Sequence, residues 1–125
     1  MADRTDEAVD ALATRIVKLI EDLDQWLRAL RVIVPPSKPW QRALRVLLDD
    51  ADRRMQILRM TEAMGKTDTE IIEAAVNVEI ACRKFNLAIH GSRADSLVKA
   101  SAKTIAKGCE TLLDLMLQAS TNQDQ

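Results

Sequence analysis

Few side chains in this 125-residue sequence combine in a way that would support catalysis. The chain has a single histidine, His90, followed by Gly91, and no Glu-x-x-His pattern lies near it. Metal sites in helical bundles draw several such ligands from facing helices, so we expect neither a metal ion nor a cofactor. A histidine that relays phosphate would precede Lys-Gly, whereas Gly-Ser follows here. The simpler interpretation is that His90 interacts with the C-terminal end of a helix.

A second candidate for chemistry is the Leu-, Arg- and Asp-rich segment 44–52. It resembles the first helix of helical chorismate mutases, in which arginines converge on a dicarboxylate. Where that pattern requires a downstream arginine, this chain has Glu62. No phosphate-binding glycine loop or nucleophile elbow is present. We therefore expect no enzymatic activity, and a small enzyme of chorismate-mutase type is the least favoured alternative.

Composition also narrows the cellular setting. Cys82 and Cys109 fall on apolar helix faces, which predicts reduced, buried thiols, with a disulfide as the minor alternative. No apolar run approaches 18 residues and no signal peptide is evident, so we expect a cytoplasmic protein without a membrane span. The 18 basic and 19 acidic residues give a net charge of −1, which offers no electrostatic reason to expect nucleic-acid binding.

The elements that position these residues are predicted to be helices. Apolar residues make up 47% of the chain, aromatic residues only 2%, and glycine and proline number three each. Apolar side chains recur at three- and four-residue steps over 5–31, 39–64, 68–90 and 93–119. Short connections between long helices make neighbours antiparallel, so the sequence predicts an all-α, up-down-up-down four-helix bundle, with 1–125 as one domain.

Local signals predict where each helix begins and ends. Thr5 and Ser92 are candidate N-caps, and Pro39 suits a first helical turn. Gly65 is a natural stop, and the segment 67–70 has the Thr-x-x-Glu pattern of a capping box. We expect the tail from Thr121 onward to be frayed.

The core face of each helix follows from the same periodicity, and Gly108 on the last helix predicts close approach by a neighbour. The predicted core residues are Leu12, Ile16, Leu19, Ile20, Leu23, Leu27, Leu30, Trp40, Leu44, Leu47, Leu48, Ala51, Met55, Leu58, Ile71, Ala75, Val78, Cys82, Phe85, Ile89, Val98, Ala102, Ile105, Cys109, Leu112 and Met116.

The two middle helices carry more apolar residues than one core stripe requires, because a bundle helix needs an apolar face only about 100° wide. Two outward lines could flank one groove that binds an amphipathic helix, with its acidic residues near two basic side chains. Scattered surface apolars and homodimerisation through the same stripe remain alternatives. The predicted partner-binding residues are Val46, Arg53, Ile57, Met60, Val76, Ile80, Lys84 and Leu87.

A row of lysines on the last helix is a secondary candidate. Lys99, Lys103 and Lys107 follow i, i+4, i+8 and point away from Ile105. A solvated outer face is the simplest interpretation. The alternative is contact with an acidic peptide.

The last helix contains Ser101-Ala102, Ile105-Ala106, Leu112-Leu113-Asp114 and Gln118-Ala119, and the second contains Leu44-Arg45-x-Leu47-Leu48-x-x-Ala51-Asp52. With Pro35-Pro36 in the first connection, this pattern resembles the focal adhesion targeting domain, a four-helix bundle of the talin and vinculin type. The resemblance implies a non-catalytic scaffold domain that binds leucine- and aspartate-rich helices, such as those of paxillin, in grooves between helices one and four and helices two and three. The chain departs from the family in having no tyrosine, so the family's phosphotyrosine docking has no acceptor here.

Overall fold

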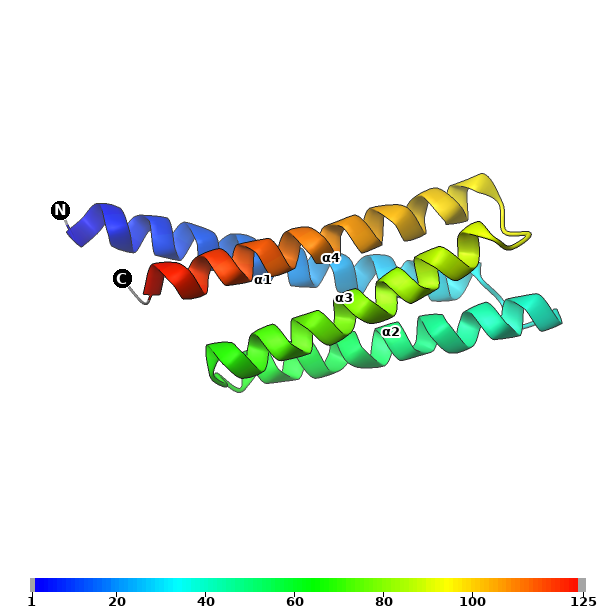
Figure 1. Ribbon diagram of the computed structural model, residues 1–125, viewed down its shortest axis with the longest axis horizontal. Helices are drawn as coiled ribbons and strands as arrows, with labels where there is room; N and C mark the ends of the chain where they lie inside the picture. The colour runs from blue at the N-terminus through cyan, green and yellow to red at the C-terminus, as the bar shows by residue number, and fades with distance from the viewer. Residues whose placement is uncertain (1, 124–125) are drawn as a thin grey trace.

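The computed structural model describes residues 2–123, and almost all of them lie in helices. The four helices are α1 (Ala2–Ile33), α2 (Pro39–Ala63), α3 (Asp68–His90) and α4 (Ser96–Gln123). Each helix packs against two neighbours, and within the described residues the backbones of diagonally opposite helices do not come close to each other. Consecutive helices run antiparallel (Figure 1). The predicted all-α four-helix bundle is therefore confirmed. No helix in residues 2–123 is both long and apolar enough to cross a membrane.

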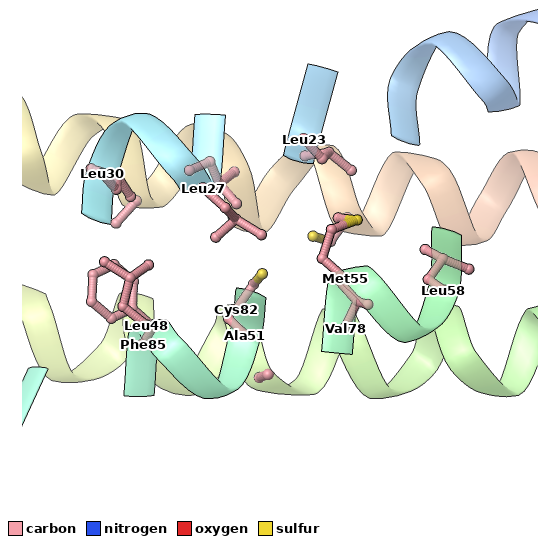
Figure 2. Close-up of a cluster of buried hydrophobic side chains, with 14 of the residues drawn as sticks. Leu23, Leu27, Leu30, Leu48, Ala51, Met55, Leu58, Val78, Cys82 and Phe85 are labelled. Carbon is pink, nitrogen blue, oxygen red and sulfur yellow. The ribbon is translucent and has the colours of Figure 1, made fainter. Parts of the chain in front are cut away.

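The core lies between two layers, α1 with α4 and α2 with α3. Figure 2 shows the leucines of α1 pointing toward side chains of α2 and α3. All predicted core residues are buried except five that are only partly buried: Ile16, Leu19, Trp40, Leu47 and Ile71. Four of these lie near the ends of the bundle or of a neighbouring helix, where no further turn covers them. Leu47 lies at the edge between α2 and α3.

The second and third helices begin and end almost as the local signals predict. α2 begins at Pro39 and ends one residue before the expected Met64. Gly65 adopts a φ of 65°, a left-handed conformation that favours glycine after a helix. The Thr67 hydroxyl then accepts a hydrogen bond from the Glu70 N–H at 3.3 Å, so threonine caps α3 as expected.

The ends of the first and last helices differ from the predictions. α1 is already helical at Ala2, so Thr5 lies inside the helix rather than capping it. At the start of α4, the Ser92 hydroxyl donates to the Ile89 carbonyl at 2.6 Å and therefore belongs to the preceding connection. Asp95 is the cap instead, because its carboxylate accepts from the Val98 N–H at 2.9 Å.

The outer helix bounds differ as well. α1 continues to Ile33 instead of ending at Arg31, and α4 begins at Ser96 rather than residue 93. α4 also continues to Gln123, so the tail expected to fray from Thr121 is helical over its described part. α1 extends through Val32 and Ile33 and ends two residues before Pro35, whereas α4 extends through polar residues that no glycine or proline interrupts.

The helices α1 and α4 approach each other closely at Gly108, and two cysteines are buried in the core. A Cβ atom built on Gly108 would lie 2.8 Å from Leu23 Cδ2, so the close approach predicted at this glycine is that of α1. Cys82 and Cys109 are free and buried, as predicted. A hydrogen bond with Cys82, together with burial, raises the pKa of the Cys109 thiol, which keeps it protonated.

Polar side chains also join α1 to α2. Asp24 is only 3% exposed, and its carboxylate accepts from Arg59 Nη1 and Gln56 Nε2, each at 2.7 Å. One turn along α1, Arg28 Nη2 lies 3.3 Å from the same carboxylate. These contacts fix the register of α1 against α2, because each residue reaches a specific turn of the other helix.

Candidate protein-binding surface

We call the eight predicted partner-binding positions of α2 and α3 the outer face. Its apolar members are not enclosed by the chain's own helices: Val46 is 68% exposed and Leu87 is 70% exposed. Ile57 and Met60 are also exposed, together with Met64 at the end of α2. Val76 is 36% exposed, and Ile80 is partly buried. The condition for a docking surface, accessible aliphatic side chains on both helices, is therefore met.

The positions face outward because the core stripes turn the opposite sides of both helices inward. On α2, Val46, Arg53 and Met60 are spaced seven residues apart and lie on one side of the helix. Because α2 and α3 are antiparallel around a short turn, residues about equally distant from that turn lie level with each other. Val46 thus lies near the level of Leu87, toward the ends remote from the turn. Apolar side chains occur on both helices at the same height.

A hollow of about 530 Å³ opens on this face. Its lining includes Val46 and Arg53 from α2 and Lys84 from α3, so the structure brings three of the eight predicted residues together. The rest of the lining is Leu47, Asp49 and Asp50. The other five predicted residues lie outside this hollow and would extend any contact along the two helices.

The charges around the hollow are unequally available. Arg53 Nη2 lies 2.6 Å from Asp50 Oδ1, so its charge is already partly neutralised. Lys84, in contrast, is exposed and makes no ion pair with any other residue that the structure describes. A carboxylate brought to the hollow by another molecule would therefore meet Lys84 without displacing an existing partner.

Asp49 also lines the hollow, but its carboxylate is bound by two arginines near the connection between α1 and α2. Burial alone would raise the pKa of this carboxyl, yet hydrogen bonds from Arg45 and Arg31 outweigh it and hold the pKa below its ordinary value. The Arg45 Nε and Arg31 Nε donors lie 2.9 and 3.0 Å from Asp49 Oδ1. Asp49 is thus an ionised, already paired neighbour and does not repel an acidic ligand as a free carboxylate would.

The secondary candidates are placed less favourably. Lys103 and Lys107 are exposed on α4, whereas Lys99 is half-buried. The row is therefore not uniformly accessible, and it lies on a different side of the bundle from the outer face of α2 and α3.

A second groove lies between α1 and α4, where the resemblance to the focal adhesion targeting domain implies one, although none of its lining residues was among the predicted binding residues. It has a volume of about 400 Å³. Trp26, 40% exposed, lines it together with Ala29, Leu30, Ile33, Ala100, Ser101, Thr104 and Ile105. None of these residues is charged. A signal was present, because Trp26 and Ile33 are seven residues apart and lie off the Leu23–Leu27–Leu30 core stripe.

The residues considered for catalysis lie on α2 and α3. His90 is exposed at the end of α3. Arg45 Nη1 donates to the carbonyl oxygens of Arg31 and Val34, each at 3.0 Å, so it ties the first connection to α2. Within the described residues, no group of three or more His, Cys, Asp or Glu side chains is placed to hold a metal ion.

Because comparison with known proteins finds no match, a function can be argued only from these surfaces. The likeness to the focal adhesion targeting domain depends on the residues quoted for it, and it stays a prediction. No family model, no curated protein and no solved structure matches this chain.

Proposed function

We propose that this chain is a non-catalytic protein-interaction domain, and that its outer face binds an amphipathic leucine- and aspartate-rich helix of another protein. The observation that carries the proposal is the presence of exposed apolar side chains on both α2 and α3, beside a hollow that is lined by the exposed side chain of Lys84. Val46 and Leu87 supply the apolar surface and Lys84 the charge.

Such a helix would place leucines at three- and four-residue steps along the aliphatic side chains of both helices. Each Val or Leu side chain that becomes fully buried contributes roughly 1.5–3 kcal/mol. Loss of translational and rotational freedom opposes association by several kcal/mol. With three or four such contacts, we expect a dissociation constant in roughly the micromolar range.

Charge would set the orientation of the bound helix. An aspartate one turn from a leucine of the ligand reaches Lys84 when the leucine contacts Val46, because both residues line the same hollow. The resemblance to the focal adhesion targeting domain points to the same class of ligand, of which the paxillin helices are examples. A cytoplasmic setting is part of the proposal.

The main rival is self-association through the same face, with a structural or regulatory role. It would bury the same apolar side chains but would bring Lys84 and Arg53 of two copies together. Sedimentation of the protein alone separates the two hypotheses, because only self-association through this face makes the mass depend on concentration and on Val46.

The test uses a fluorescein-labelled amphipathic peptide of leucine and aspartate, titrated by fluorescence anisotropy. Val46→Asp removes an apolar contact and adds a carboxylate opposite an acidic ligand, so binding should weaken at least about tenfold. Val32→Asp is the matched control, because Val32 is 84% exposed but lies at the end of α1. Circular dichroism should show unchanged helicity for both, since exposed substitutions alter stability by about 0.5 kcal/mol or less.

The charge contact has its own test. Lys84→Glu should weaken binding of the aspartate peptide more than it weakens binding of a peptide in which asparagine replaces aspartate. If both valine variants weaken binding equally, or if Lys84→Glu affects the two peptides alike, the outer face is not the binding site.

A further inference from the structure

Two connections between helices lie at the same end of the bundle (Figure 1). They join α1 to α2 and α3 to α4, and residues of both line one hollow of about 230 Å³. Ile33, Pro35 and Trp40 line it from the first connection and its flanking turns. Arg93 and Asp95 line it from the second. The two connections therefore form one continuous surface at the tip of the bundle, built from segments that are far apart in the sequence.

Charge is distributed unevenly along the bundle. Residues 32–42 and 90–99 contain four basic residues and one acidic residue, so we call this surface the basic end. Its acidic residue, Asp95, already accepts the hydrogen bond that caps α4. Around the opposite connection, between α2 and α3, residues 61–74 contain four acidic residues and one basic residue. The four bases of the basic end are Lys38, Arg42, Arg93 and Lys99.

These bases are available to another molecule. None of the four forms an ion pair with another residue that the structure describes. Lys38, Arg42 and Arg93 are exposed, and Lys99 is half-buried. The Arg42 guanidinium donates to the carbonyl oxygen of Ser37 at 3.1 Å, which leaves its charge uncompensated. An anionic surface would therefore meet three accessible positive charges without displacing a carboxylate.

Large aliphatic side chains are exposed among these bases. Val32 in the last turn of α1 is 84% exposed, and Ile33 beside it is 49% exposed. Leu97, in the first turn of α4, is 69% exposed. Ile33 lines the groove between α1 and α4, and Leu97 lies one turn before the groove residue Ser101, so both border the same side of the bundle. The basic end therefore presents apolar and cationic side chains together.

We propose that the basic end binds the surface of a bilayer that contains anionic phospholipids. Lys38, Arg42 and Arg93 contact the headgroups, while Ile33 and Leu97 enter the boundary between headgroups and acyl chains. A helical ligand requires an elongated groove, whereas a tip as narrow as the bundle suits a broad surface. The same bilayer repels the acidic connection between α2 and α3, which orients that end of the bundle away from the membrane. None of the eight residues of the outer face takes part, so this proposal does not rest on peptide binding.

Binding should require both the charges and the aliphatic side chains. Each basic side chain close to an anionic bilayer strengthens binding about fivefold, so three of them give roughly a hundredfold. This contribution should fall as salt shortens the distance over which the charges act. On a neutral bilayer only the aliphatic side chains remain, and they present less apolar surface than one acyl chain, which by itself binds only marginally.

Co-sedimentation of the full chain with sucrose-loaded vesicles tests the proposal. Phosphatidylcholine vesicles with about 30% phosphatidylserine should bind the wild-type chain, and pure phosphatidylcholine vesicles should not. Salt at about 0.5 M should release the bound chain. Lys38→Glu should weaken binding at least about tenfold. Lys107→Glu is the matched control, because Lys107 is also exposed but lies three turns along α4, and it should have little effect.

A second matched pair tests the aliphatic contact. Leu97→Ser should weaken binding at least about threefold, whereas Leu117→Ser, at an exposed position near the other end of α4, should not change it. Circular dichroism should show unchanged helicity for every variant. A wild-type chain that stays in the supernatant with phosphatidylserine vesicles overturns the proposal, and so does an equal effect within either pair. Loss of binding with Lys38→Glu but not with Leu97→Ser would also overturn it, because it would indicate a site for a soluble polyanion instead of a bilayer.

Discussion

Gly108 should resist replacement by alanine although it lies inside α4. In an ordinary helix, glycine to alanine stabilises by about 1 kcal/mol through helix propensity alone. Here the new Cβ would lie 2.8 Å from Leu23 Cδ2, closer than any normal carbon–carbon contact. Leu23 is fully buried, so it can move only by displacing other core side chains.

The two effects oppose each other, and their magnitudes decide the sign. Overpacking of a filled core costs about 1–3 kcal/mol. After subtraction of the propensity gain of about 1 kcal/mol, Gly108→Ala should lower the free energy of unfolding by about 1 kcal/mol. A chain of this length would lose roughly 4 °C in Tm.

A double-mutant cycle makes the reasoning refutable. Leu23→Ala removes the clashing atom and costs about 2–5 kcal/mol by itself. In that background, Gly108→Ala should stabilise by about 1 kcal/mol, because the propensity gain is no longer opposed. Ala100→Gly, at an exposed position of α4, measures the propensity difference directly. Urea unfolding of these variants gives the free energies. If Gly108→Ala stabilises the wild-type background, α1 and α4 are not as close as described.

Two further predictions concern ion pairs. Asp24→Asn should lower the free energy of unfolding by about 1–2 kcal/mol, less than a fully enclosed pair would lose, because the side chains of Arg59 and Arg28 are 41% and 60% exposed; chemical denaturation with an unchanged m-value would support this, and a neutral effect would contradict it. Asp49→Asn should cost at most about 1 kcal/mol at pH 7 because Asp49 is 48% exposed. Since the folded pKa of Asp49 is lowered, its contribution is complete above the ordinary pKa of 3.8 and is lost as pH falls through the lower folded value. Stability curves of wild type and Asp49→Asn should therefore converge only below pH 3.8; convergence at neutral pH would contradict the assigned pairing.

The helices could be predicted wherever the deciding signal is local. The start of α3 follows from one hydrogen bond within a turn, that between Thr67 and Glu70. The start of α4 could not be decided in this way, because Ser92 and Asp95 can both cap a helix. The choice depends on the Ile89 carbonyl, which engages the Ser92 hydroxyl in the preceding turn.

The candidate surfaces, like the helix ends, were predictable only where the deciding signal is local. The outward aliphatic side chains of α2 and α3 follow from helical period and a short antiparallel turn, so their exposure was predictable. Burial of Asp24 was not, since a carboxylate is normally exposed and this one is paired with residues more than thirty positions away.

The two grooves differ in charge, and that difference should decide where an acidic helix binds. The groove between α1 and α4 is lined by uncharged residues, whereas Lys84 lies free beside the outer face of α2 and α3. Trp26 lines the first groove, neither tryptophan lines the hollow on the outer face, and the chain has no tyrosine. A tryptophan-free acidic peptide should therefore increase the anisotropy of its own label without shifting tryptophan emission. A shift that Trp26→Phe abolishes would instead place the peptide between α1 and α4, and it would show that apolar area outweighs the charge of Lys84 in selecting the groove.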